Sequence, residues 1–91
     1  MIELITIFKT NQNWYLNKVF VNSEHIMTIA ESVEHNSLLK EGKISLPLSE
    51  SITFSIVRMD PKTGFKEFVV VGSPTMILEK MKHNKKQLLK G

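Results

Sequence analysis

Most of the chain follows the two-residue hydrophobic period that is typical of β-strands. The clearest run is residues 51–59, in which Ile52, Phe54 and Ile56 alternate with smaller or polar residues. Other runs are rich in aromatic and β-branched types, which favour strands. The pattern predicts six strands, at residues 2–9, 14–21, 25–30, 43–48, 51–59 and 65–71.

Turn residues predict how these strands connect. The sequence TNQN separates the first two strands, which we expect to form a hairpin. The sequence DPKTG places Asp60 at the entry of a second turn, Pro61 where a φ of about −65° is needed, and Gly64 where φ is positive. Strands 51–59 and 65–71 should therefore form the second hairpin.

Residues 32–50 mix charges, a glycine and a proline, and we expect them to form a variable loop. Within this loop, residues 43–48 alternate in hydrophobicity and predict a short strand. Pro47 has no backbone N–H to donate to a central ladder, so this strand should lie at an edge of the sheet.

A single helix is predicted at residues 74–89. Ser73 is a favourable N-cap, and Pro74 stands at the first helical position, where the missing N–H costs nothing. Its apolar stripe should lie on the sheet and consists of Ile77, Leu78, Met81 and Leu88. The predicted fold is therefore α+β: one domain, residues 1–91, with a five- or six-stranded antiparallel curved sheet or half-barrel closed by one C-terminal helix.

Composition narrows the class of protein. With 42% hydrophobic and 23% charged residues, the chain is typical of globular domains. No run approaches the roughly 20 apolar residues of a membrane span, and no basic segment precedes the first apolar one, so we expect a cytoplasmic protein. The absence of cysteine excludes disulfides, thiolate metal sites and cysteine nucleophiles.

The candidate chemistry is sparse. Gly72-Ser73-Pro74 lacks the glycines of a phosphate-binding loop, and Pro74 removes an amide that an anion would use, so we interpret it as a strand end and helix start. The three histidines lack metal-ligand spacing, and Asp60 is the sole aspartate and is explained by its turn. We therefore predict no catalytic residue, no metal site and no cofactor.

Two features could bind a partner. Residues 1–50 carry four lysines against six glutamates, whereas residues 51–91 carry eight lysines and arginines against three acids. The basic residues of the helix that lie off its apolar stripe are Lys80, Lys82, Lys85, Lys86 and Lys90. They would give salt-sensitive contacts with nucleic acid, or they serve only solubility. Trp14 and Tyr15 face opposite sides of their strand, so the exposed one is a candidate for base stacking or for anchoring a protein.

Two segments carry a resemblance to a known family. The matching positions are Val21-Asn22, Ile26, Ile29, Ile52, Gly64, Val69–Val71, Ser73-Pro74, Ile77 and Met81. In these positions the chain is similar to the small FlbD/SwrD-like proteins of bacterial flagellar operons. The resemblance implies a small non-enzymatic accessory protein, without catalytic residues.

The sequence thus favours a non-enzymatic cytoplasmic accessory or regulatory protein, of bacterial or phage origin, that binds another protein. The binding surface would be the exposed face of the helix or a sheet edge, at Ile2–Phe8 or near Pro47. Homo-oligomerisation through a sheet edge is also expected as one outcome. The alternative function is a nucleic-acid-binding module that uses the basic C-terminal helix.

Overall fold

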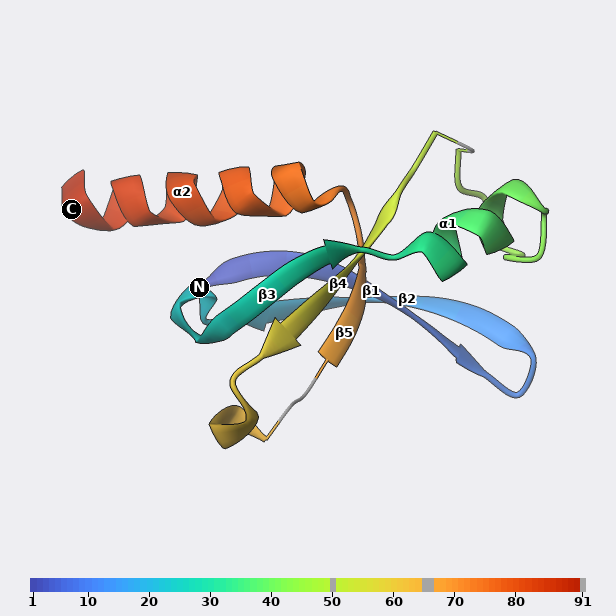
Figure 1. Cartoon of the computed structure of the whole chain (residues 1–91), viewed down its shortest axis with the longest axis horizontal. Helices are drawn as coiled ribbons and strands as arrows, with labels where there is room; N and C mark the ends of the chain where they lie inside the picture. The colour runs from blue at the N-terminus through green and yellow to red at the C-terminus, as the bar shows by residue number, and fades with distance from the viewer. Residues whose placement is uncertain (50, 65–66, 91) are drawn as a thin grey trace.

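The computed structural model describes residues 1–49, 51–64 and 67–90, without the side chains of Thr63 and of residues 84–90. These residues form an α+β fold with five antiparallel strands in one open sheet and two α-helices (Figure 1). The strand order is β2-β1-β5-β4-β3. The elements are β1 (Ile2–Thr10), β2 (Asn13–Val21), β3 (Ile26–Glu31), α1 (Val33–Lys40), β4 (Phe54–Met59), β5 (Glu67–Val71) and α2 (Pro74–Lys90), with short 3-10 helices at Ser23–His25 and Pro61–Thr63.

The first predicted hairpin is confirmed. Strands β1 and β2 pair without interruption, from Ile2 opposite Val21 to Thr10 opposite Asn13. The two residues between them, Asn11 and Gln12, have φ values of 50° and 71°. Two consecutive positive φ values match the right-handed twist of paired strands, and this turn therefore fixes the register of the whole hairpin.

The second predicted hairpin is also present, between β4 and β5. Asp60 accepts a hydrogen bond from the Lys62 N–H at 3.0 Å, and Gly64 has the expected positive φ, 88°. Strand β4 begins at Phe54 rather than at residue 51. The first two residues of the predicted strand 65–71 lie outside the described residues, and β5 covers Glu67–Val71.

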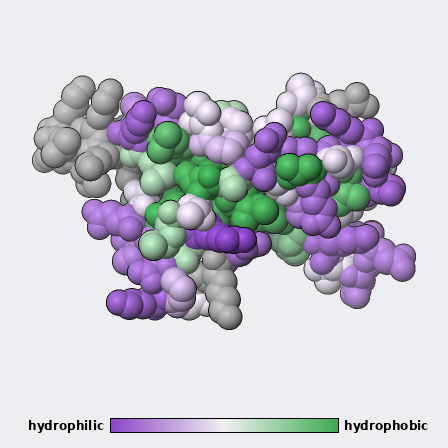
Figure 2. Space-filling model, viewed as in Figure 1, coloured by the Kyte–Doolittle hydropathy of each residue, from purple (hydrophilic) through white to green (hydrophobic). Residues whose placement is uncertain are grey.

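The two hairpins meet where Thr6 in β1 pairs with Val70 in β5, the one registered pair between these strands among the described residues. Two hydrophobic cores lie on opposite faces of the sheet. The first contains Leu4, Val57, Val70 and Ile77, and the second contains Ile7, Phe54, Leu39 and Ile44. In the face drawn in Figure 2, apolar residues gather in the middle, with polar residues around them.

Helix α2 covers one end of the first face, where it contacts β1 and β3. The predicted N-cap is present, because Ser73 Oγ accepts a hydrogen bond from the Met76 N–H at 3.2 Å. The predicted apolar stripe is correct at Ile77, which is buried, and at Met81, which is half-buried. It is wrong at Leu78, which is 44% exposed. Ile77 and Met81 are four residues apart and share the helix face that packs on the first core, whereas Leu78 lies to the side of that face. The Leu88 side chain lies outside the described residues.

The predicted variable loop at 32–50 is wrong over residues 33–40, which form helix α1. Ser32 is its N-cap: Ser32 Oγ accepts a hydrogen bond from the His35 N–H at 3.4 Å. The helix has eight residues and fully buries only Leu39, so the sequence shows no clear 3.6-residue period. A polar contact holds it to the sheet instead, since Asn36 Oδ1 accepts a 2.7 Å bond from the Phe54 N–H.

The predicted strand at 43–48 is absent: these residues pair with no strand in the described part of the chain. The alternation of apolar and polar residues in this segment indicates which side chains are covered, not that the backbone forms a strand. Ile44 is buried and Leu46 and Leu48 are half-buried against the second core. The Leu48 N–H donates to the Leu46 carbonyl at 2.7 Å, which bends the segment, and Pro47 has no N–H to offer a ladder. The segment is therefore an irregular cover over the sheet.

The contact between Asn36 and Phe54 gives a stability prediction. Asn36→Ala leaves the part-buried Phe54 N–H without its acceptor, so the free energy of unfolding should fall by about 1–3 kcal/mol. The matched control is Ser37→Ala, at an exposed position of the same helix, which should change stability by less than about 0.5 kcal/mol. Urea unfolding measures both, and equal losses in the two variants would contradict the role given to Asn36.

Candidate groove and surrounding surface

A groove opens on the first face of the sheet, beside the end that α2 covers. It lies between the β1–β2 hairpin and strands β4 and β5, and its volume is about 870 Å³. This volume falls in the range of sites that bind small molecules or apolar side chains of a partner. Its apolar lining includes Phe8, Val19, Phe20, Val21, Met59 and Phe68.

The polar groups of the groove are few and largely engaged. Thr6 Oγ1 donates to the Asn17 carbonyl at 3.0 Å. The Glu67 carboxylate accepts a hydrogen bond from Arg58 Nε at 3.1 Å. The other ionisable group in the lining is His25. Among the described residues, no three His, Asp or Glu side chains come close enough together to hold a metal ion. The lining of the groove is therefore mainly apolar.

A pair of exposed aromatic rings stands at the end of the hairpin. Phe8 lines the groove and is directly opposite Tyr15, and their rings stack with centroids 5.6 Å apart. The two side chains are 44% and 45% exposed. Large exposed rings next to an apolar groove are typical of binding surfaces.

The structure thus distinguishes the two aromatic residues that the sequence left open. Tyr15 is exposed, whereas Trp14 is half-buried against the second core and donates from Nε1 to the Lys43 carbonyl at 3.1 Å. Sequence reasoning missed Phe8 as a partner of Tyr15. A turn of two residues at Asn11 and Gln12 places Phe8 opposite Tyr15. The length of the turn could therefore have predicted this pair from the sequence.

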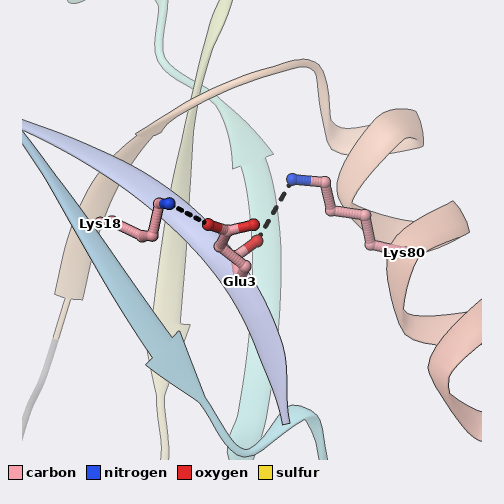
Figure 3. A network of polar contacts seen from close by, with 3 residues as sticks. All are labelled: Glu3, Lys18 and Lys80. Atoms are coloured by element: carbon pink, nitrogen blue, oxygen red, sulfur yellow. Dashed lines mark hydrogen bonds and ion pairs between the residues drawn. The ribbon is translucent and has the colours of Figure 1, made fainter.

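The structure describes the side chains of two of the five candidate lysines of α2, Lys80 and Lys82. Lys80 Nζ donates to the backbone carbonyl of Glu3 at 3.2 Å, while the Glu3 carboxylate pairs with Lys18 at 3.0 Å (Figure 3). Lys82 Nζ lies 3.9 Å from Glu79 Oε1. The side chains of Lys85, Lys86 and Lys90 lie outside the described residues. Lys80 thus ties α2 to β1 in addition to adding positive charge.

The polar groups of the Gly72-Ser73-Pro74 junction form hydrogen bonds within the fold. The Gly72 N–H donates to the Thr53 carbonyl at 2.8 Å, and the Gly72 carbonyl accepts from Ser55 Oγ at 2.7 Å. Gly72 has φ of 120°, in the region that favours glycine. With Ser73 Oγ capping the helix, the junction connects a strand to a helix, as the sequence predicts.

One serine–histidine contact has the distance of a nucleophile and its base. Ser32 Oγ lies 2.8 Å from His35 Nδ1. However, Ser32 is 1% exposed, and its oxygen also caps α1. The His35 ring lies 5.9 Å from that of Trp14 and 6.2 Å from that of Phe54. This pair is therefore placed to hold α1 on the second core.

No protein-family model, curated protein or solved structure matches this chain. No helix among the described residues is both long and apolar enough to cross a membrane.

The groove itself can be tested with a neutral apolar dye such as Nile red, whose fluorescence rises on binding. Phe8→Ser removes a ring at the rim and should weaken dye binding about tenfold, because burying a phenyl ring is worth roughly 1.5–3 kcal/mol. Val33→Ser is the matched control, since Val33 is 69% exposed on α1 and does not line the groove. Equal weakening by both variants would place the dye elsewhere.

Proposed function

We propose that this chain is a small, non-enzymatic, cytoplasmic accessory protein of bacterial or phage origin that acts by binding another protein. The observation that supports this proposal is the apolar groove of about 870 Å³, with the stacked Phe8 and Tyr15 rings beside it. An accessory role also agrees with what the resemblance to the flagellar family implies.

The chemistry of the groove favours an uncharged, apolar segment of the partner as its occupant. Among the lining residues, only His25 and Glu67 are ionisable, and Glu67 already has Arg58 as its counter-charge. A charged ligand would lose its hydration without finding an opposite charge, whereas apolar side chains gain about 25 cal/mol for each Å² that they bury.

The alternative function, nucleic-acid binding through the basic face of α2, has less support. Lys80 is tied to Glu3 near the start of β1, whereas the aromatic platform lies at Phe8. Five residues of extended strand separate these two positions by roughly 16 Å. A base stacked on Tyr15 would therefore not place its own phosphate on Lys80.

One experiment separates the two functions. The chain is immobilised and a bacterial lysate is passed over it at physiological salt, using wild type, Phe8→Ser, and the triple variant Lys82→Gln, Lys85→Gln, Lys86→Gln. We expect a defined protein to be retained by wild type and by the triple variant, and to be lost with Phe8→Ser, because only that change alters the groove.

The opposite pattern would support the alternative. If the triple variant loses its partner and Phe8→Ser keeps it, and if single-stranded oligonucleotides bind wild type with steep salt dependence, the basic helix is the binding surface. Val33→Ser is the control for loss of an exposed apolar side chain, and it should retain the same partner as wild type.

A further inference from the structure

Strand β2 is a long edge strand with one unpaired side. Its nine residues pair with β1, and in the described part of the chain they pair with no other strand. The mean strand in globular proteins has about five or six residues, so β2 is unusually long for an edge. Its outward N–H and C=O groups form a row that can accept another strand.

The other edge of the sheet is protected in ways that β2 is not. Strand β3 has six residues, its pairing with β4 skips Met27, and α2 packs beside it. A short length and a bulge each hinder strand addition at an edge. Strand β2 has no proline, no glycine and no break in register, and its single charge, Lys18, is paired with Glu3 (Figure 3).

From this contrast we propose that a second copy of this chain pairs with β2, antiparallel and about a two-fold axis, to give one continuous ten-stranded sheet. Most soluble homo-oligomers are closed symmetric assemblies, and the two-fold dimer is the commonest of them. The proposal goes beyond the binding of another protein, because it concerns the chain alone and needs no partner.

Symmetry fixes the register. A two-fold axis perpendicular to the sheet keeps each side chain on its own face, so it must pass between two copies of the same residue. Only the axis at Asn17 pairs all nine residues of Asn13–Val21 with their counterparts. Moving the axis to Lys18 would place two lysines opposite each other, which destabilises a strand pair.

The register at Asn17 makes the strand complementary to itself. Trp14 comes opposite Phe20 of the second copy, and Tyr15 comes opposite Val19 of the second copy. Aromatic–aromatic and aromatic–β-branched pairs are the kinds that stabilise neighbouring strands. Phe20 is 63% exposed in the single chain, and the pairing gives this side chain a neighbour.

The pairing also has a consequence for the groove. Val19 lines the groove, and Tyr15 of the second copy would stand beside it at the edge. Because the axis keeps faces unchanged, the two grooves of the dimer open on the same side of the ten-stranded sheet.

A cysteine placed on the axis tests the proposal directly, because the chain has no cysteine of its own. Opposite residues in antiparallel strands have Cα atoms about 4.5–5.5 Å apart, within the range of a disulfide. Under mild oxidation Asn17→Cys should therefore convert to a covalent dimer.

Asn13→Cys is the matched control, an asparagine that is also exposed on β2. In the proposed register its two copies lie roughly 27 Å apart, too far for a disulfide, so it should stay a single chain. The proposal is overturned if Asn13→Cys cross-links as readily as Asn17→Cys, or if folded Asn17→Cys does not cross-link.

A second pair of variants tests the register without covalent chemistry. Leu16 comes opposite Lys18 of the second copy, so Leu16→Lys places like charges together and Leu16→Glu places opposite charges together. Leu16 is 42% exposed, and both variants lose the same apolar side chain. With two such pairs in each dimer, Leu16→Lys should dissociate about tenfold more readily than Leu16→Glu.

Sedimentation equilibrium measures these dissociation constants on the purified chain. Equal constants for the two variants, or a wild-type chain that stays monomeric at every concentration, would overturn the proposal. Either outcome is distinguishable from failure of the proposed function, because the Nile red and lysate experiments vary Phe8 on β1, whereas the cysteine and Leu16 variants change only β2.

Discussion

The structure depends on one strand, β1, that serves two hydrophobic cores on opposite faces of the sheet. Leu4 is buried in the first core and Ile7 in the second, and between them Thr6 makes the pair with Val70 that joins the two hairpins. Thr6 is itself buried, and its hydroxyl bonds to Asn17 on the neighbouring strand. The two helices are divided between these faces, with α2 on the first core and α1 on the second.

The crossing explains why so much apolar surface stays open. Helix α2 covers the first face near Leu4, and α1 with the irregular segment after it covers the second face near Ile7. A chain of 91 residues has little else with which to cover a sheet on both sides. The remaining part of the first face becomes the groove, and in the described part of the chain no strand pairs with the outer side of β2. Both proposed interactions use surface that the fold itself leaves uncovered.

The sequence predicted the elements that are determined by residues close together in the chain. The hairpin turns at Asn11 and at Asp60 and the capped start of α2 follow from turn and cap chemistry over a few residues, and the structure confirms them. Helix α1 was missed because a short helix that is held by Asn36 and one buried leucine leaves no hydrophobic period. Residues 43–48 were assigned to a strand because alternation records which side chains are covered, but it does not record whether the backbone has a neighbour to pair with.

What the sequence determined by itself is therefore the class of fold, the antiparallel hairpins and the absence of cysteine chemistry, since each depends on residue type or on neighbours along the chain. Only the tertiary structure decided that β2 and β3, rather than β1, are the edges of the sheet, and that Tyr15 rather than Trp14 is exposed beside Phe8. These facts depend on contacts between segments far apart in the chain, such as Trp14 with Lys43 and Lys80 with Glu3. Alternation gives a strand two faces, but the packing of the other elements decides which of them is covered.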